Sequence, residues 1–321
     1  MKPFPLITQP MPKEIGVVGT FIRDTIITLD NRKVESIGGI YHALAYLASL
    51  AAGGTVIRPL CHVGEGFHED VRRAVRAFDA DVRFEATLPV AQDNTAVTLI
   101  YRSAETRDEI TTAPMPPVTS KQMRALSGLD ALLVNLITGQ DIDLQALQDF
   151  KQQSPATLVY LDFHSLALGI DAHGRRFYRR PASWQSWVRA ADILQLNERE
   201  AATLAGWKTE PREADFIDFG ESLVGAFVSA CHLTIGSRGS VLFYRSGDKV
   251  LHEYMPPVSD LQTVDIIGCG DAFGAAFLTR FLRTCDYVEA TRFANRVAGL
   301  NCSFLGSLTP EKFQTYVAPY L

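Results

Sequence analysis

The sequence predicts an α/β protein built on a mostly parallel, doubly wound sheet. From residue 130 onward, apolar strand-like runs alternate with helical segments, and we expect strands at 131–137, 157–163, 191–196, 231–235 and 241–245. Four of these runs are continuous and rich in leucine or β-branched residues, as in strands buried on both faces. The chain has 321 residues with 47% apolar content, enough to bury one large core. We therefore expect residues 1–321 to form a single domain.

The first strand is expected at residues 15–19, where Ile15-Gly16-Val17-Val18-Gly19 reads as a buried strand ending at a tight turn. A dinucleotide-binding fold would place Gly-x-Gly-x-x-Gly and an immediate helix at this point. The chain has neither, which disfavours a dinucleotide enzyme.

Two stretches alternate apolar and polar residues and predict exposed hairpins rather than helices. They lie at about 20–36 and 94–113, and together they suggest a small β lid on the main domain. Arg102 and Arg107 of the second stretch are candidates to clamp an anion, or simply solvated strand residues. Between the two stretches, the glycine pair Gly38-Gly39 precedes leucines at helical spacing, so we expect a helix to begin there.

The segment Asp265-Ile266-Ile267-Gly268-Cys269-Gly270-Asp271 runs directly into an apolar helical pattern. Its glycines allow tight turning and close approach by a phosphate, and first-turn amides of a helix have no intrahelical acceptors. Such a turn can bind an anion beside the Asp271 carboxylate. On the residues alone, Asp271 is either a helix cap or a proton acceptor.

This segment resembles the carboxyl-terminal signature of the PfkB family of carbohydrate kinases, Asp-Thr-x-Gly-Ala-Gly-Asp before a helix. The resemblance implies a ribokinase-like fold, in which the amides of Gly268, Cys269 and Gly270 stabilise the transferred phosphoryl group and Asp271 takes the proton of the substrate hydroxyl. It also implies a monovalent cation site near Asp265. Two residues depart from the pattern, because Ile266 stands in place of Thr and Cys269 in place of Ala.

The amino-terminal signature of the same family, Gly-Gly-x-x-x-Asn-x-Ala, is matched only in part. Gly38 and Gly39 are present, and they imply a substrate site with Asp24 as the residue that binds sugar hydroxyls. The family's Asn is Ala43 here, and His42 is the candidate to replace it. As alternatives, Asp24 is an ordinary turn acid and His42 an ordinary packed histidine.

Further motifs follow in the order typical of the family. Asn197 and Glu200 resemble the Asn-x-x-Glu motif, which implies a magnesium ion held through water; the same spacing also satisfies a capping box. The loop Gly236-Ser237-Arg238-Gly239 and a later helix containing Asn295 imply a nucleotide site formed by Asn197, Gly236, Ser237, Gly239 and Asn295. The cofactors implied are ATP, Mg²⁺ and a monovalent cation.

Bulk properties narrow the partners and the compartment. The formal net charge of −5 and the lack of a basic run argue against a nucleic-acid partner. The five cysteines form no CxxC pair, which disfavours a disulfide framework or structural zinc and favours a cytoplasmic location. No apolar run reaches 18 residues and residues 1–14 lack an apolar signal core, so neither membrane spanning nor export is indicated. By analogy with the family, a homodimer through the lid is expected.

Taken together, the motifs predict an ATP-dependent phosphotransferase that acts on a hydroxyl of a sugar or sugar-like small molecule. Two alternatives stay open. One is a nucleoside or vitamin-alcohol kinase of the same superfamily, since the sugar signature is incomplete. The other is a non-catalytic ligand-binding regulator on the same fold, against which the presence of Asp271 and Glu200 argues.

Overall fold

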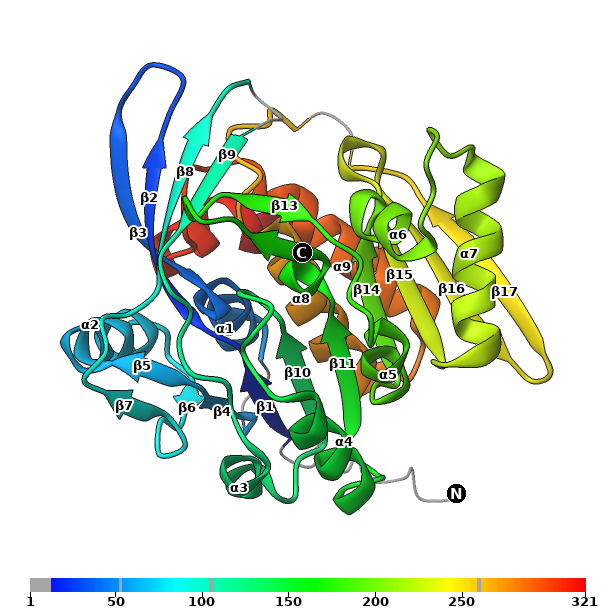
Figure 1. Ribbon diagram of the computed structural model, residues 1–321, viewed down its shortest axis with the longest axis horizontal. Coiled ribbons are helices and arrows are strands. Elements are labelled where there is room, and N and C mark those ends of the chain that lie inside the picture. The colour runs from blue at the N-terminus through cyan, green and yellow to red at the C-terminus, as the bar shows by residue number, and fades with distance from the viewer. Residues whose placement is uncertain (1–12, 52–53, 104–106, 259–260) are drawn as a thin grey trace, which may run out of the picture.

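The computed structural model describes residues 13–51, 54–103, 107–258 and 261–321. Its centre is a nine-stranded sheet in the order β17-β16-β15-β14-β11-β10-β1-β4-β6 (Figure 1). The strands are β1 (Glu14–Val18), β4 (Val56–Leu60), β6 (Asp81–Val82), β10 (Ala131–Asn135), β11 (Leu158–Asp162), β14 (Ile193–Asn197), β15 (Ala230–Thr234), β16 (Ser240–Ser246) and β17 (Lys249–Met255).

Strands β6, β4, β1, β10, β11, β14 and β15 are parallel, while β16 and β17 run antiparallel at one edge. The expected α/β class and mostly parallel sheet are therefore confirmed. Every predicted strand is present within a few residues of its expected bounds. Strand β17 was not expected, because its alternating, largely exposed sequence lacks the apolar run of a buried strand.

Helices cover both faces of the sheet and form two apolar layers. One layer contains α1 (Ile40–Leu50), α2 (Glu65–Arg76), α8 (Cys269–Thr284) and α9 (Tyr287–Asn301). The other contains α3 (Ser120–Met123), α4 (Leu144–Gln153), α5 (Trp184–Arg189), α6 (Glu198–Ala205) and α7 (Glu213–Ala226). Strand residues alternate between the layers: Leu133 of β10 packs in the first and Leu132 in the second. The short helix α10 (Pro310–Lys312) lies near the carboxyl terminus.

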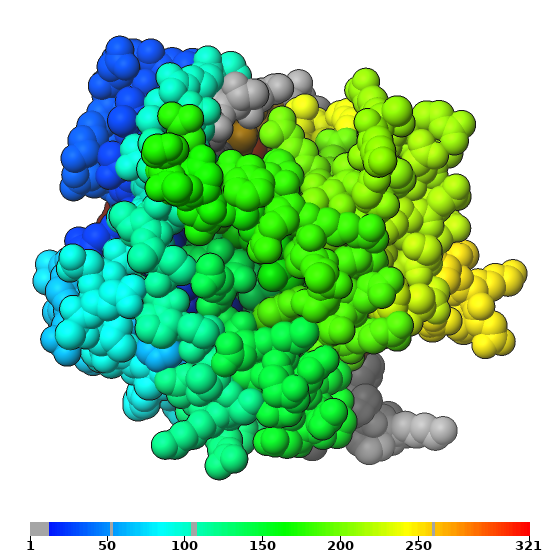
Figure 2. All heavy atoms as spheres, viewed as in Figure 1, coloured from blue at the N-terminus to red at the C-terminus, as the bar shows by residue number. Residues whose placement is uncertain are grey.

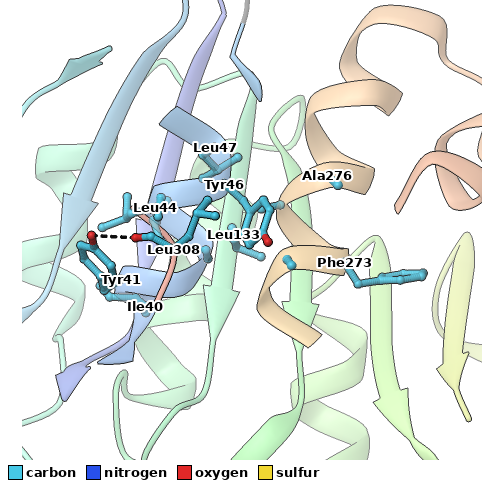
Figure 3. Close-up of a cluster of buried hydrophobic side chains, with 14 of the residues drawn as sticks. Ile40, Tyr41, Leu44, Tyr46, Leu47, Leu133, Phe273, Ala276 and Leu308 are labelled. Carbon is cyan, nitrogen blue, oxygen red and sulfur yellow. Dashed lines mark hydrogen bonds between the residues drawn. The ribbon is translucent and has the colours of Figure 1, made fainter. Parts of the chain in front are cut away.

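Helices α1 and α8 are joined by the apolar cluster in Figure 3, in which Tyr46 and Leu47 of α1 and Ala276 of α8 share one core with Leu133. The Tyr41 hydroxyl also donates to the carbonyl of Leu308 at 3.1 Å. This packing fixes the amino terminus of α1 relative to that of α8, and both termini carry predicted site residues.

The two stretches predicted as hairpins form β2 (Phe21–Ile27) with β3 (Lys33–Gly39), and β8 (Ala96–Tyr101) with β9 (Arg107–Thr111). Strands β2 and β8 pair in parallel, so the hairpins make one four-stranded sheet in the order β3-β2-β8-β9. We name this the lid sheet; it stands beyond the large sheet, on the side where β10 and β11 end (Figure 1).

Another hairpin lies beside the lid sheet and was not predicted. It consists of β12 (Leu168–Ile170) and β13 (Arg176–Tyr178), and we name it the third hairpin. The amide of Thr111 donates to the carbonyl of Gly174 at 2.9 Å, and Ile110 bridges Arg175. The third hairpin therefore packs against β9, as the green and cyan atoms in Figure 2 show. A small pair, β5 (His62–Gly64) and β7 (Leu88–Val90), completes the strands of the described residues.

Some predictions fall on residues outside the described ranges, namely most of the 1–14 segment and the tip of the second lid hairpin. The side chain of Arg107 is likewise outside the described part. Arg102 is 60% exposed and pairs with Asp108 at 2.6 Å, which favours the solvated interpretation over an anion clamp. Across the described ranges, none of the helices combines the length and apolarity needed to cross a bilayer.

Candidate active site

The predicted anion-binding turn lies at the start of α8. Gly268 is the N-cap residue with φ of 75°, a left-handed conformation that a β-carbon would strain. Cys269 and Gly270 begin the helix, and Asp271 lies in its first turn. The amides of a first helical turn lack intrahelical acceptors and lie at the positive end of the helix dipole. The turn is therefore a candidate anion site beside a carboxylate, in which the Cys269 amide also donates to the Ile266 carbonyl at 3.4 Å.

Asp271 is buried, with 8% of its surface exposed. Its Oδ1 accepts a hydrogen bond of 2.5 Å from Nδ2 of Asn135, the last residue of β10. Burial raises the pKa of Asp271 to about 7, and the hydrogen bond from Asn135 acts in the opposite direction. A carboxylate with a pKa near neutrality can both accept and release a proton at physiological pH.

Side-chain amides hold the turn on two sides. Gln195 of β14 donates from Nε2 to the carbonyl of Gly270 at 3.1 Å, and its Oε1 accepts from the Tyr160 hydroxyl at 2.6 Å. Asn301 of α9 donates to the carbonyl of Ile267 at 2.8 Å. Two turn carbonyls are thus fixed by buried partners, which leaves the turn little freedom to reorient.

The predicted substrate residues lie next to this turn. Asp24 on β2 and His42 on α1 are both buried, and His42 Nε2 lies 4.0 Å from Asp24 Oδ2. A methyl group at Gly38 would lie 1.7 Å from Asp24 Oδ2, and one at Gly268 would lie 2.7 Å from His42 Nδ1. His42 therefore lies close to both Asp24 and Gly268. Gly39, the N-cap of α1 with φ of 63°, completes this group.

Arg176 of β13 is a further candidate site residue, which the sequence did not predict. Its side chain is 6% exposed, and it donates to Ser165 Oγ and to the carbonyl of Ile137. Its Nε lies 3.8 Å from Glu109 Oε2 and has no hydrogen-bond acceptor among the described residues. Burial lowers the pKa of Arg176, while the carboxylates of Glu109, Asp141 and Asp24 oppose that effect. The third hairpin therefore brings a buried cation close to Asp24.

Asn197 and Glu200 form the predicted capping box at the start of α6. The backbone N–H of Asn197 donates to Glu200 Oε2 at 2.9 Å, and the backbone N–H of Glu200 donates to Asn197 Oδ1 at 2.9 Å. Burial raises the pKa of Glu200 to about 8. The pKa of Asp162 lies well above its usual range because the group is buried and faces the carboxylates of Glu200 and Asp271.

These three acids come together near the carboxyl ends of β11 and β14. Cα partners in the sheet are Asn135 with Asp162 and Asp162 with Gln195. A cation would relieve their mutual repulsion, and Mg²⁺ keeps several of its waters. Within the described ranges, no group of three or more His, Cys, Asp or Glu side chains forms a direct metal cage. The proximity of the three acids makes them candidate partners of a hydrated ion.

The predicted nucleotide loop follows β15. Gly236 and Ser237 open a 3-10 turn that Gly239 ends, and strand β16 begins at the next residue. Because Asn197 is the Cα partner of Thr234, the last residue of β15, the loop lies beside the Asn197–Glu200 pair. The predicted nucleotide and magnesium residues therefore share one edge of the sheet.

Asn295 of α9 supports the strands on either side of this loop. Its Oδ1 accepts from the Ser240 hydroxyl at 3.1 Å, and its Nδ2 donates to the carbonyl of Pro256 at 2.7 Å. Ser240 begins β16, and Pro256 directly follows β17. Asn295 therefore positions the loop through its neighbours, with both of its amide atoms engaged.

Asp265 connects the lid sheet to the site. Its Oδ1 accepts from the Tyr101 hydroxyl of β8 at 2.6 Å and from the Ile267 amide at 3.0 Å. Its Oδ2 accepts from the Gly306 amide at 2.8 Å. A monovalent cation at Asp265 would share the carboxylate with these three donors.

A large parallel sheet with helices on both faces, a small lid sheet over its carboxyl edge and a glycine turn at α8 define a ribokinase-like fold. Comparison with solved structures agrees. A structure described as a sulfate complex of a pyrophosphate-dependent kinase in the ribokinase family has a TM-score of 0.75 and 18% identity, covering 94% of this chain and 99% of that chain.

The family model of the PfkB family carbohydrate kinases matches residues 175–312 of this chain. Ribokinase from Arabidopsis thaliana is 32% identical over 125 residues, which are 36% of this chain and 30% of that protein. ATP-dependent ribose-1-phosphate kinase from Halopiger xanaduensis is 32% identical over 120 residues, 37% of this chain and 36% of that protein. The matches thus span about a third of the length of these curated relatives.

Proposed function

We propose that this protein is a kinase that transfers the γ-phosphoryl group of ATP to a hydroxyl of a sugar or sugar-like small molecule. One observation carries the proposal: Asp271, a buried carboxylate with a pKa of about 7, lies in the first turn of α8 directly after the Gly268–Gly270 turn. Transfer of a phosphoryl group to a hydroxyl requires a base next to a site that binds the anion.

In this proposal Asp271 accepts the proton of the acceptor hydroxyl, and the amides of Gly268, Cys269 and Gly270 stabilise charge on the transferred group. Asn135 orients the base through its 2.5 Å hydrogen bond. Gln195 and Asn301 hold the turn carbonyls so that the amides face the reacting group. Preorganised donors of this kind are often the largest contribution to catalysis.

The Asn197–Glu200 pair, with Asp162 beside it, would hold Mg²⁺ through water. When bound, the ion would neutralise charge on the nucleotide phosphates. The protein's own contribution is the capping box, which fixes both side chains at the carboxyl end of β14. Gly236, Ser237 and Gly239 would border the nucleotide, and Asn295 would position their loop through Ser240 and Pro256.

The acceptor would lie between the lid sheet and the turn. Asp24 would accept hydrogen bonds from its hydroxyls, the Gly38 and Gly39 backbone would approach its ring, and His42 would lie between it and Gly268. Arg176 Nε supplies a buried donor for an acceptor oxygen. A polyhydroxylated molecule satisfies such paired acceptors and donors best, because each buried polar group then keeps a partner.

The lid sheet would close over the acceptor and exclude water, which protects ATP from hydrolysis. Its outer edge, β3, is the strand through which a homodimer would form. We propose that Asp265 mainly anchors the lid sheet, by accepting the hydrogen bond from Tyr101, and that binding a cation is not its chief role. The cysteine content supports a cytoplasmic, reducing location.

The decisive experiment measures ADP release from Mg-ATP against pentoses, hexoses, sugar phosphates, nucleosides and vitamin alcohols. One strong acceptor is expected, and Asp271→Ala should lower kcat by about 10² to 10⁴ while ATP affinity is largely kept. Near-normal turnover in Asp271→Ala would remove Asp271 from the mechanism. Tight ligand binding without transfer would instead support the regulatory alternative.

A further inference from the structure

Two cysteine thiols are in contact at the anion turn. Cys269 lies between Gly268 and Gly270, and Cys302 is the C-cap residue of α9. Their sulfur atoms are 3.3 Å apart, and both residues are half-buried. The two positions are 33 residues apart in the sequence, so the fold itself brings the thiols together.

Both cysteines also hold the segment that leads to the turn. Asn301 Nδ2 donates to Cys269 Sγ at 3.3 Å as well as to the carbonyl of Ile267 at 2.8 Å. The carbonyl of Cys302 accepts from the Val264 amide at 2.7 Å and from the Asp265 amide at 3.3 Å. A change in the position of either sulfur is therefore transmitted to residues 264–270.

We propose that Cys269 and Cys302 form an oxidative modification site, at which a low-molecular-weight disulfide such as oxidised glutathione converts the two thiols into an intramolecular disulfide that disables the anion turn. The effect on turnover rests on the proposed function, whereas the modification itself does not. A disulfide has a sulfur–sulfur distance of about 2.05 Å, so the two atoms must approach from their present 3.3 Å separation.

That approach alters the site because Cys269 is held at a helix terminus. Drawing its sulfur toward α9 pulls the Cys269 amide with it and removes the thiol from the Asn301 contact. The amides of Gly268, Cys269 and Gly270 then lose the arrangement proposed above for the anion site. Loss of a single donor of an anion hole lowers kcat by about 10² to 10³.

The chemistry balances with the oxidant named. One protein thiolate attacks a sulfur of the glutathione disulfide, which forms a mixed disulfide and releases one glutathione thiolate. The second protein thiolate attacks the protein-side sulfur, which forms the Cys269–Cys302 bond and releases the second glutathione. The two thiol protons end on the two released glutathione molecules, and the protein loses two electrons.

The remaining cysteines provide controls. Cys61 and Cys231 are buried, and burial raises the pKa of Cys231 to about 12, so both should react slowly. Cys285 is exposed and reports general thiol reactivity. The matched variants are Cys302→Ser, which removes the partner sulfur and leaves every residue of the anion turn in the sequence, and Cys285→Ser, which leaves the pair intact.

The experiment incubates the reduced full-length protein with oxidised glutathione, blocks remaining thiols by alkylation and identifies linked peptides by mass spectrometry. Turnover and Mg-ATP affinity are measured on the same samples before and after dithiothreitol. We expect a linked peptide joining positions 269 and 302, an approximately 10²-fold fall in turnover and full recovery on reduction. Cys302→Ser should keep its turnover under oxidant, and Cys285→Ser should respond as the wild type does.

Alkylation of both Cys269 and Cys302 under conditions that oxidise Cys285 would overturn the proposal. A linked peptide with unchanged turnover would overturn it as well. If the reduced protein transferred phosphate to no acceptor, the proposed function would fail separately. The linked peptide, whose detection does not depend on turnover, would then still support or refute the disulfide between the two thiols.

Discussion

Asn135 Nδ2 donates a hydrogen bond of 2.5 Å to Asp271 Oδ1, and the Oδ1 of the same Asn135 has no hydrogen-bond partner among the described residues. Asn135 is 1% exposed. The side-chain nitrogen of Asn135 can therefore hold the proposed base, Asp271, in position. The side-chain oxygen can accept a hydrogen bond from an incoming hydroxyl. Asn135 links the end of β10 to the chemistry proposed for α8.

Replacing Asn135 with Leu should raise the pKa of Asp271 above about 7, because the hydrogen bond that lowers it is removed. Since the base acts in its ionised form, kcat/KM should rise with pH through a midpoint near 7 in the wild type and through a higher midpoint in the variant. At pH 7 we expect a loss of about 10- to 100-fold. Asn94→Ser, at a buried amide that bonds Gly64 and Phe21, should leave the midpoint in place. Equal midpoints for Asn135→Leu and wild type would contradict the role of Asn135.

Asp271→Asn should stabilise the protein at alkaline pH while abolishing turnover. The folded-state pKa is raised from 3.8 to about 7, so the stability that the protonated group contributes is present below pH 4 and is lost as pH rises through 7. The variant avoids that loss, and its free energy of unfolding at pH 8 should exceed that of the wild type by up to about 4 kcal/mol. Urea unfolding at pH 5 and pH 8 measures the difference.

Asp149→Asn is the control of opposite sign, because hydrogen bonds from Ser120 and Gln145 lower the pKa of Asp149. Its substitution should not stabilise the protein at pH 8. A wild type whose stability matches Asp271→Asn at both pH values would show that Asp271 titrates normally.

Gly38→Ala should weaken acceptor binding selectively. A β-carbon at this position would lie 1.7 Å from Asp24 Oδ2, so the carboxylate must move away from its place beside His42. We expect KM for the acceptor to rise about tenfold or more, equivalent to loss of one charged hydrogen bond, with KM for ATP unchanged. Gly225→Ala is the matched control, because nothing lies within 4 Å of its added carbon. An unchanged KM for the acceptor would exclude Asp24 from substrate binding.

Tyr101→Phe should loosen the lid without altering the base. The substitution removes the 2.6 Å hydrogen bond to Asp265 and keeps the ring. Lid docking should weaken by about 1 to 3 kcal/mol, so the ratio of acceptor phosphorylation to ATP hydrolysis should fall. Both products can be followed in one reaction mixture. If the ratio is preserved, the lid does not depend on Asp265 for docking.

Much of the fold was predictable because its signals are local in the sequence. Strands β10, β11 and β14 are apolar runs, and the glycines at 38, 39 and 268 mark places where the chain turns. The third hairpin was missed because β12 and β13 are only three residues long and carry no alternating pattern.

The supporting residues of the site were harder to predict because their partners are distant in sequence. Asn135 and Gln195 bond residues 136 and 75 positions away, and no periodicity reveals such pairs. A weak signal existed, since Asn135 is the single polar residue of β10 and Gln195 is a polar residue flanked by leucines in β14. Arg176 gave none, because an arginine in a short polar hairpin is normally solvated.

The carbonyls of Ile267 and Gly270 are each tied to a buried side-chain amide. In an unsupported loop, every arriving phosphate would first have to turn the surrounding dipoles toward itself, and that reorganisation would add to the barrier of each cycle. Here the dipoles are aligned once, when the chain folds, and the stability of the core maintains them. In the proposed reaction, the rate of phosphoryl transfer is thereby linked to the packing of β14 and α9, which carry Gln195 and Asn301.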